Sequence, residues 1–373
     1  MRVVAPLIVG GAPAGCAAAI ALARLGHRAT IIERDRETGD AICGGFLSWR
    51  TLDALAALGV ASEQLRGAPV SSVRLVAAHG SGEAPLPRPA IGVSRRTLDT
   101  AMQRVAARAG VGFERGVAVR AIEGQTLRLA DGGTVAAPAI FLANGKHDLR
   151  GAARDAARRA DPTLGLRVRL APHPALARMV GHAIELHLFA GGYAGLMLHE
   201  DGSANLCMAI RRSRLRAAGD PAALLAALAR EVPPLADRLA HARGPIDAIA
   251  NVPYGWRATG TQAGRFRLGD QAAVIPSLAG EGLGIAMASG TAAAAAYDRG
   301  GPGAAPACQA AFARDAAIPL RRAALLRDLA QHPLGARMML GLMRLAPGAA
   351  GIAGRLTRIK HRPVDDGTRT QHI

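Results

Sequence analysis

The pattern of apolar and polar positions near the start of the chain predicts a βαβ unit. Val3 to Val9 is a nearly continuous apolar run, which is typical of a strand buried on both faces. Ala14 to Leu25 is rich in Ala, Leu and Ile and is followed by Gly26, as in a helix with a glycine stop. A second short strand follows at Ala29 to Glu33. The next elements expected are a helix at Leu98 to Ala109 and a buried strand at Val135 to Leu142.

The middle of the chain has a different pattern, which predicts antiparallel strands. His182 to Leu188 alternates apolar and polar residues over most of its length, and Asn205 to Ile210 is another strand candidate. Gly191-Gly192 is expected to form a turn between them. Such strands suit a sheet with one covered face. The elements expected after them are a helix at Pro221 to Glu231 capped by Asp220, a strand at Phe266 to Leu268, helices at Gly282 to Tyr297 and Met338 to Leu345, and a loose polar tail from Lys360.

Composition and charge narrow the function classes. The net charge of +18 invites a nucleic-acid interpretation, but the basic residues are nearly all Arg and are scattered along the chain. Aromatic residues are only 3% of the chain, so the stacking platforms that single-stranded nucleic acid needs are mostly absent. We therefore expect no nucleic-acid partner. A basic surface leaves open an anionic substrate, a carrier protein or a membrane surface as a partner.

The cysteines and the N-terminus bear on metal binding and location. Cys16, Cys43, Cys207 and Cys308 lack the spacing of zinc ligands or of a disulfide framework, so no metal site is expected. The chain begins directly with a predicted strand, without the pattern of a signal peptide. No apolar stretch of about 18 residues is free of charges. We expect a cytoplasmic protein.

The N-terminal βαβ unit carries a candidate dinucleotide-binding fingerprint. The fingerprint needs one glycine for a tight turn and another for helix–strand packing, and Gly10 and Gly15 fit these positions. Ala12 stands where a further glycine usually lets the pyrophosphate approach. The helix N-terminus at Pro13 and Ala14 still offers free N–H groups to a diphosphate. The acid at the end of the second strand, Glu33, has the spacing expected for binding ribose hydroxyls, with Arg34 beside it. These residues alone do not decide whether the bound cofactor is NAD or FAD.

A second segment, from Arg265 to Gly284, decides between these cofactors. A strand ends in Gly269-Asp270, a proline follows, and a glycine-rich turn opens a small-residue helix. This segment resembles the FAD-binding superfamily of para-hydroxybenzoate hydroxylase, geranylgeranyl reductases and flavin-dependent halogenases. The resemblance implies that Asp270 holds a ribityl hydroxyl. It also implies that the backbone of Gly282-Leu283-Gly284 lies against the pyrimidine edge of the flavin, where helix N-terminal amides would stabilise negative charge.

Two shorter segments add to this resemblance. Arg95 matches the family's arginine that meets the phosphate and ribose region of FAD. Cys43-Gly44-Gly45 resembles the Cys-Gly-Gly of geranylgeranyl reductases near the flavin, which implies cofactor contacts for the two glycines and makes Cys43 a candidate catalytic residue. Asn144-Gly145 corresponds to the family's Asp-Gly turn, with Asn in place of Asp.

The substrate-facing residues depart more from the family. Tyr193 aligns with the tyrosine of the family's substrate strand, and Gly195 stands where a tryptophan would be. We expect Tyr193 and Gly195 to contact substrate, with Gly195 opening space over the flavin. The lysine and tryptophan features of halogenases are not found. Lys146-His147-Asp148 is interpreted as a solvated loop, because consecutive residues do not point at one another. His187 is a candidate for a side chain that faces a pocket.

The expected architecture is α/β (α+β overall). It is a Rossmann-like FAD-binding domain of discontinuous segments with an inserted antiparallel β substrate lobe and C-terminal helices. The expected ranges are 1–70, 92–150 and 260–300 for the FAD-binding domain, 71–91 and 151–259 for the substrate lobe, and 301–373 for the C-terminal helical segment and tail. Within the last range, the segment from Met338 onward mixes apolar residues with arginines. Ordinary packing is expected there, and peripheral membrane docking is left open.

Several functions follow from this sequence interpretation. We expect an FAD-dependent oxidoreductase, and a monooxygenase that uses NAD(P)H and acts on an apolar, aromatic or polyketide-like small molecule is favoured. Only one dinucleotide fingerprint is present, so NAD(P)H is expected as a transient donor, unless a separate reductase supplies the electrons. A geranylgeranyl-reductase-like enzyme that reduces a carbon–carbon double bond is the alternative. A non-catalytic binding protein with a flavoprotein-like fold is a further one.

Overall fold

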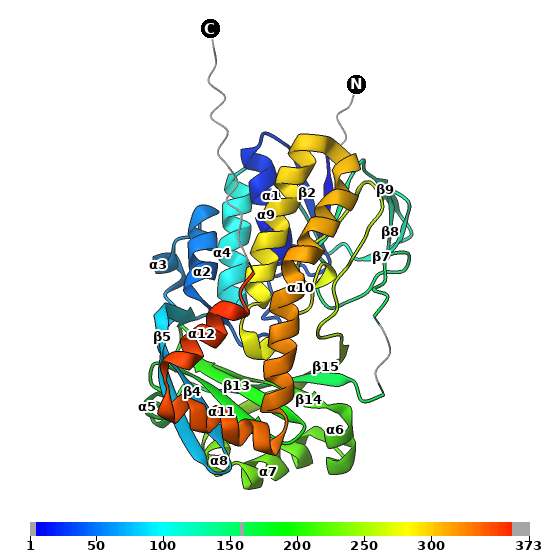
Figure 1. Cartoon of the computed structure of the whole chain (residues 1–373). Coiled ribbons are helices and arrows are strands. Elements are labelled where there is room, and N and C mark those ends of the chain that lie inside the picture. Colours follow the sequence, from blue (N-terminus) through cyan, green and yellow to red (C-terminus); the bar gives the residue numbers. More distant parts are fainter. Residues whose placement is uncertain (1–4, 157–159, 360–373) are drawn as a thin grey trace.

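The computed structural model describes residues 5–156 and 160–359, which form two lobes, each built on one main sheet (Figure 1). Val3 and Val4 of the first predicted strand and the tail from Lys360 lie outside the described residues. Among the described residues, no helix combines the length and the apolar character needed to cross a bilayer.

The upper lobe contains a five-stranded parallel sheet with the order β16-β10-β1-β2-β6. Alternate residues of these short strands point to opposite faces. Ile8, Ile31 and Phe141 pack against helices, whereas Val9 and Leu142 pack toward a small antiparallel sheet, β7-β8-β9. Both faces are therefore covered, which explains the continuous apolar runs. The strands of these two sheets are β1 (Leu7–Val9), β2 (Thr30–Glu33), β6 (Gly112–Arg115), β7 (Val119–Glu123), β8 (Thr126–Leu129), β9 (Thr134–Ala136), β10 (Ile140–Leu142) and β16 (Arg265–Arg267).

The predicted strand Val135 to Leu142 is wrong as a single element. Its two ends belong to different sheets, β9 and β10, and Pro138 lies between them. A proline has no backbone N–H to donate to a ladder, so it interrupts the strand at this point. The apolar run is continuous in sequence, but the chain changes layer within it.

The lower lobe is an eight-stranded sheet with the order β15-β11-β14-β13-β12-β4-β5-β3. All of its strand pairs are antiparallel except β12 with β4. The predicted turn is present at Gly191, directly after β12, and it leads into β13, a further strand that lies between β12 and β14 in the sheet. The strands are β3 (Phe46–Leu47), β4 (Ala68–Ala77), β5 (Gly80–Gly92), β11 (Thr163–Leu170), β12 (Ala183–Phe189), β13 (Gly192–Leu198), β14 (Ala204–Arg211) and β15 (Ala242–Val252).

Helices complete both lobes (Figure 1). α1 and α9 cross closely in the upper lobe, where a Cβ at Gly290 would lie 2.7 Å from the carbonyl oxygen of Ala14. Helices α5 to α8 lie on one face of the large sheet, and the other face is covered in part by α11. The long α10 runs from the upper lobe to the lower one (Figure 1). The α-helices are α1 (Pro13–Arg24), α2 (Trp49–Ala57), α3 (Ser62–Leu65), α4 (Arg95–Arg108), α5 (Pro174–Val180), α6 (Arg212–Ala218), α7 (Pro221–Glu231), α8 (Pro233–Leu239), α9 (Gly282–Gly300), α10 (Ala305–Ala330), α11 (Pro333–Leu345) and α12 (Gly348–Leu356).

The predicted helices are confirmed with small changes at their ends. The helix at Pro221 to Glu231 is α7 without change, and the Asp220 carboxylate accepts a hydrogen bond from the N–H of Ala223 at 2.8 Å. α4 begins three residues earlier than predicted because Ser94 caps it. α11 begins at Pro333, whose missing N–H is tolerated in the first helical turn.

Candidate functional site

The carboxyl ends of β1, β10 and β16 meet at one edge of the parallel sheet. The chain leaves β1 toward β2 on one side, and β10 lies on the other side, so the strand order changes direction between β1 and β10. Ligands of open α/β sheets bind at such switch points. Gly10, Asn144 and Gly269 follow these three strands directly or within two residues.

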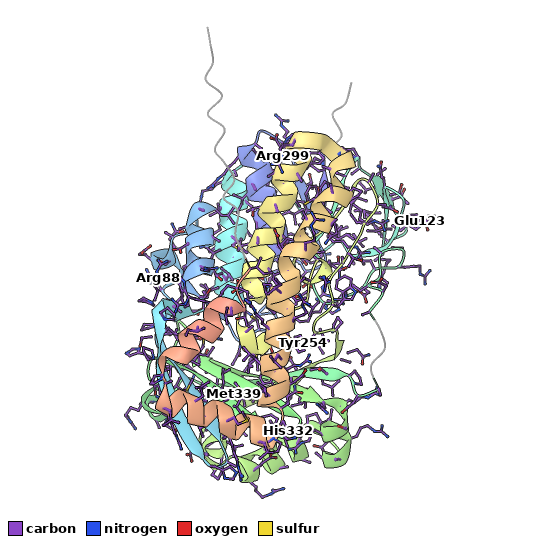
Figure 2. The ribbon with its side chains drawn as sticks, in the orientation of Figure 1. Arg88, Glu123, Tyr254, Arg299, His332 and Met339 are labelled. Carbon is purple, nitrogen blue, oxygen red and sulfur yellow. The ribbon has the colours of Figure 1, made fainter. Side chains whose placement is uncertain are left out.

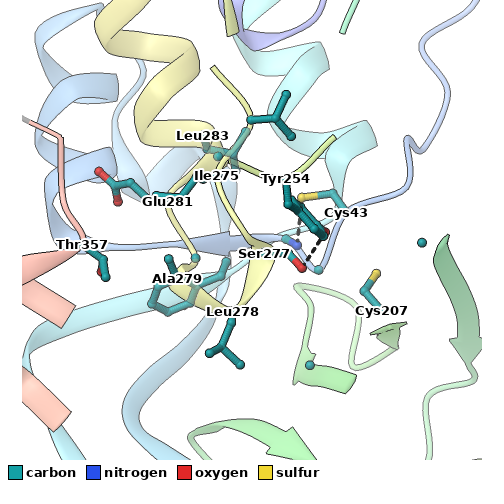
Figure 3. Close-up of a pocket in the computed structure, with 18 of the residues that line it drawn as sticks. Cys43, Cys207, Tyr254, Ile275, Ser277, Leu278, Ala279, Glu281, Leu283 and Thr357 are labelled. Atoms are coloured by element: carbon teal, nitrogen blue, oxygen red, sulfur yellow. Dashed lines mark hydrogen bonds between the residues drawn. The ribbon is translucent and has the colours of Figure 1, made fainter. Parts of the chain in front are cut away.

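A cavity of about 450 Å³ lies between this edge and the inner face of the large sheet. Its wall contains most of the residues that the sequence selects: Ala12, Pro13, Ala14, Cys43, Gly44, Gly45, Arg95, Gly269, Asp270, Gly282, Leu283, Tyr193 and Gly195. Five selected residues do not line it: Gly10, Gly15, Glu33, Arg34 and Gly284. Segments far apart in sequence therefore meet around one space, part of which Figure 3 shows.

Gly10 and Gly15 serve the backbone rather than the wall of the cavity. Gly10 has a φ of +105°, and a Cβ there would lie 2.6 Å from the carbonyl oxygen of Ala143. A Cβ at Gly15 would lie 2.0 Å from the carbonyl oxygen of Gly10. Both positions require glycine, because the turn after β1 and the packing of α1 against that turn leave no room for a side chain.

Glu33 and Arg34 differ in their surroundings. One carboxylate oxygen of Glu33 accepts a hydrogen bond from the N–H of Gly11 at 2.7 Å, and the other accepts one from Asp35 at 3.0 Å. Glu33 thus fixes the glycine turn from the end of β2. Arg34 is exposed and pairs with Asp35 at 3.4 Å, away from the cavity wall.

Arg95 lies at the start of α4 and pairs with Asp99 one turn later. Its Nε and Nη2 atoms lie 2.9 and 2.8 Å from the two carboxylate oxygens. Burial opposes the charge of Arg95, but Asp99 and the neighbouring Cys43 outweigh it and raise the pKa of the guanidinium. Arg95 therefore presents a fixed positive charge to the cavity. Its backbone N–H donates to Asp40 at 3.1 Å, which ties α4 to the loop before Cys43.

Lys146 is a site residue that the sequence analysis missed. The interpretation of Lys146-His147-Asp148 as a solvated loop is wrong for Lys146. Its side chain lines the cavity, and its ammonium lies 3.2 Å from the Asp270 carboxylate. Asp270 raises the pKa of Lys146, against the opposing effect of burial. The pair joins the loop after β10 to the loop after β16. Only the parallel pairing of these strands brings them together, so the local sequence gave no signal.

The turn that opens α9 is held by a buried acid. The carboxylate of Glu281 is fully buried, and it accepts hydrogen bonds from Arg358 and from the N–H of Ile359. Burial raises the pKa of Glu281, and Arg358 opposes this effect. A Cβ at Gly284 would lie 2.5 Å from the Glu281 carboxylate, so Gly284 makes room for this acid. The last described residues of the chain are thereby fastened to the turn at Gly282 to Gly284.

The loop that carries Cys43 is fastened to the large sheet. Arg167 of β11 binds Asp40 at 2.9 Å and the carbonyl oxygen of Ala41 at 2.9 Å. The side-chain amide of Asn205 donates to the carbonyl oxygen of Cys43 at 3.2 Å, and His199 lies 2.9 Å from that of Gly44. Cys43 is thus presented at the cavity wall by contacts from the other lobe.

Three hydroxyl groups form a polar cluster on the wall near the large sheet. The hydroxyl of Tyr193 lies 2.7 Å from Ser277 Oγ, and Tyr254 donates to the same oxygen at 2.9 Å. Figure 3 shows Tyr254 and Ser277 side by side at the cavity, and Figure 2 places Tyr254 at the junction of the two lobes. Burial raises the pKa of both tyrosines, so they are neutral phenols at neutral pH. Sequence reasoning selected Tyr193 but missed Tyr254 and Ser277, which no motif marks.

Gly195 lies on the face of β13 that also presents Tyr193 and Met197 to the cavity. A Cβ at Gly195 would find its nearest neighbours, Leu186 Cδ2 and the carbonyl oxygen of Cys207, at 3.6 and 3.9 Å. A small side chain therefore fits, and a large one would extend into the cavity. The hypothesis that Gly195 opens space stays a prediction.

The expectation that His187 faces a pocket is wrong. His187 is fully buried and lies 3.1 Å from Glu185, which also binds Arg74 and Arg238. This network belongs to β12 and its neighbours rather than to the cavity wall. In the described part of the chain, no group of three or more His, Cys, Asp or Glu side chains is arranged to hold a metal ion.

The residues around the cavity fit FAD. The first turn of α1 lines the cavity with small residues, and backbone N–H groups in a first turn have no partner within the helix. A Cβ at Gly282 would meet no protein atom within 4 Å, so the space beside this turn is open to another group. The buried Oδ1 of Asn144 has no hydrogen-bond partner among the described residues, and Asn144 adjoins the cavity-lining Gly145.

Comparison with known proteins agrees with this geometry. Residues 3–147 match the family model described as "FAD binding domain". PqsL of Pseudomonas aeruginosa, solved in complex with 2-aminobenzoylacetate, is similar over 90% of this chain and 99% of its own, with 20% identity and a TM-score of 0.71. The flavin-dependent brominase Bmp2 is similar over 95% and 93%, with 17% identity and a TM-score of 0.76. No curated protein sequence matches. Residues 3–147 are therefore similar to an FAD-binding domain, and the chain has the fold of these flavin-dependent enzymes.

Proposed function

We propose that this FAD-dependent oxidoreductase is a monooxygenase that acts on an apolar, aromatic small molecule. The observation that carries the proposal is the cavity, which joins the FAD-binding residues to a mainly apolar wall of the large sheet. Apolar side chains from four strands face this space: Val73, Leu75, Leu186, Met197 and Ile249. Binding sites of this composition favour apolar ligands and orient them through a few polar groups.

The hydroxyl cluster of Tyr193, Tyr254 and Ser277 supplies such polar groups. Neutral phenols within an apolar wall donate or accept one directed hydrogen bond, which suits a substrate carbonyl or hydroxyl. Their raised pKa values make them poor general bases at neutral pH, so their role is orientation of the substrate. The complex of PqsL with 2-aminobenzoylacetate, an aromatic keto acid, supports an aromatic substrate for this related fold.

The cofactor supplies the redox chemistry when bound: it accepts hydride from NAD(P)H and delivers electrons to dioxygen. In the balanced reaction, substrate, dioxygen, NAD(P)H and a proton give oxygenated substrate, water and NAD(P)⁺. The protein would hold the diphosphate at the N-terminus of α1 and the ribityl chain at Asp270. The backbone N–H groups that begin α9 would stabilise negative charge on the flavin ring.

The electron donor is part of the proposal. One dinucleotide fingerprint is present in the sequence, so we propose that NAD(P)H visits the site transiently, and a separate reductase is the other source of electrons. A cytoplasmic location, expected from the sequence, would give access to reduced pyridine nucleotides.

Oxygen dependence tests the proposal. Enzyme reconstituted with FAD is mixed with NADH or NADPH and a panel of aromatic compounds, and oxygen uptake and product mass are followed. A monooxygenase consumes oxygen in proportion to product. If product forms equally well without oxygen, the enzyme is a reductase of the geranylgeranyl reductase type, in which Cys43 would be the first residue to substitute. A colourless protein that cannot be reconstituted with FAD would contradict both the monooxygenase and the reductase function.

A further inference from the structure

The last two helices expose an unusual run of apolar side chains. Among the described residues, the large exposed apolar side chains all lie on α10, α11 and α12. Six of them lie on the last two helices, and we name these six the C-terminal apolar face: Leu334, Met338, Leu342, Leu345, Ile352 and Leu356. Met338 is 70% exposed and Leu345 is 89% exposed. Proteins rarely leave contiguous apolar patches in water without a binding partner.

The spacing shows that this face is a helical stripe. The four positions on α11 are separated by four, four and three residues, which places them on one side of the helix. The opposite side of α11 is buried, with Leu340 and Met343 packed against β4 and β5. α11 is therefore held to the protein by one apolar side and presents a second apolar side outward.

The charges around the face indicate its partner. From Pro333 to Leu356 the chain has no Asp or Glu, and Arg337, Arg344 and Arg355 are exposed there. Arginine carries its charge at the end of an apolar stem, so it can sit at the level of lipid headgroups while the stem follows the apolar surface. Within α11 and α12 every charged side chain is therefore positive, and a stripe of Leu and Met with these arginines beside it matches an anionic lipid surface.

The face is continuous with the cavity. Leu342 is 55% exposed and also lines the cavity, together with Leu326, Met339 and Met343. In Figure 2, Met339 lies on the helix that runs in front of the large sheet. The same helix thus has one side at the cavity and another in the C-terminal apolar face.

We propose that the C-terminal apolar face docks onto a membrane surface that contains anionic lipid. Docking places Leu342, where the face meets the cavity, at the lipid boundary. An apolar compound dissolved in the bilayer then has a short path to the cavity. Peripheral docking of this kind needs no spanning helix. The surface goes beyond the proposed function and does not depend on it.

Vesicle binding tests this surface with the FAD-loaded full chain. The vesicles are phosphatidylcholine alone or phosphatidylcholine with phosphatidylglycerol, and binding is measured by flotation. The expected result is binding to the anionic vesicles that weakens at high salt. Met338→Ser with Leu345→Ser should weaken binding at least tenfold, because two apolar side chains no longer enter the interface. Arg337→Gln with Arg355→Gln should weaken it roughly fivefold for each arginine.

The matched control removes two arginines from the upper lobe. Arg299 lies at the far end of α9, away from α11 (Figure 2), and Arg120 lies on β7. Arg120→Gln with Arg299→Gln lowers the net charge by the same amount and should bind vesicles as the unchanged protein does. Retained FAD and an unchanged melting temperature show that each variant is folded.

The proposal is overturned if the protein binds neither kind of vesicle, or if the control weakens binding as much as Arg337→Gln with Arg355→Gln. It is also overturned if the face proves to be the interface of a dimer that Met338→Ser with Leu345→Ser converts to monomers.

Discussion

The ammonium of Lys146 lies 3.2 Å from the carboxylate of Asp270 and joins the loops that follow two neighbouring parallel strands. The pair lies at the cavity, on the side formed by the glycine turn of α1. Lys146 therefore holds the Asp270 carboxylate in place from the neighbouring loop. The orientation of this carboxylate depends on a residue far away in sequence.

Substitution of Asp270 by Ala should weaken FAD binding about fivefold or more. The change removes the proposed hydrogen-bond acceptor for the ribityl chain and leaves Lys146 without its carboxylate partner, at a cost of about 1 to 3 kcal/mol. Fluorescence titration of the apoprotein with FAD measures the effect. Asp148→Asn is the matched control, because Asp148 pairs with Arg154 and does not line the cavity. Equal weakening by both substitutions would contradict the role given to Asp270.

Substitution of Tyr193 or Tyr254 by Phe should raise KM for the substrate about three- to tenfold and leave the FAD affinity unchanged. The lost hydroxyl contributes one hydrogen bond of about 0.5 to 1.5 kcal/mol to substrate orientation. Steady-state kinetics separates KM from kcat. Tyr297, the third tyrosine of the chain, packs against Phe141 in the upper lobe, so Tyr297→Phe should leave KM as it is. An unchanged KM for both cavity variants would remove the hydroxyl cluster from the substrate site.

A large side chain at position 195 should block the substrate without displacing FAD. Gly195→Trp would extend into the cavity and should reduce kcat/KM at least tenfold, whereas Gly195→Ala should have little effect because its Cβ meets only ordinary contacts. Kinetics and the flavin absorbance of the purified variants provide the two readouts. Full activity in Gly195→Trp would show that substrate binds elsewhere.

The Arg358–Glu281 pair should stabilise both the fold and the turn of α9. Arg358→Ala leaves a fully buried carboxylate without its cation, which costs about 3 to 5 kcal/mol of unfolding free energy. Urea unfolding measures this loss, and FAD release on gel filtration reports on the turn. Arg355→Ala, one turn earlier and exposed, should change neither quantity. Equal unfolding free energy and equal FAD release in the two variants would show that the Arg358–Glu281 pair does not stabilise the fold or the turn.

The buried Glu185 network should make stability depend on acid pH. Burial opposes ionisation of Glu185, but His187 and Arg238 outweigh it and lower its pKa to about 2, from an ordinary 4.5. Because the pKa of Glu185 is lower in the folded state, its ionisation contributes roughly 3 kcal/mol to the free energy of unfolding above about pH 4.5. This contribution is lost as the pH falls toward 2. The difference in unfolding free energy between the unchanged protein and Glu185→Gln should shrink over this interval. A difference in unfolding free energy that stays constant with pH would contradict the lowered pKa of Glu185.

Local chemistry explains which parts of the site could be predicted from sequence. The glycine turn at Gly10 and Gly15 was predictable because a tight turn and a helix start lie within one βαβ unit. The expected contact of Glu33 with ribose hydroxyls stays a prediction, and its carboxylate accepts a hydrogen bond from the N–H of Gly11. Gly269-Asp270 and the turn at Gly282 form a second local pattern. Lys146, Tyr254 and Arg358 were not predictable, because each acts through a partner that only the tertiary fold supplies.

The same distinction applies to the fold. The helices with clear caps, such as α7 with Asp220, were predicted closely. The strands of the large sheet were predicted only in part, because β4 pairs with the distant β12 and because the sequences of β4 and β5 contain Gly, Pro and Arg. Their stability comes from the cross-strand neighbours and not from their own propensity.

The most direct test of monooxygenase function is product formation under isotopically labelled dioxygen. The FAD-loaded enzyme is supplied with NAD(P)H and an aromatic substrate found by screening, and the product mass is measured. The account predicts that one oxygen atom of each product molecule comes from dioxygen and that NAD(P)H is consumed in equal amount. A product without the label, formed at the same rate in the absence of oxygen, would contradict it.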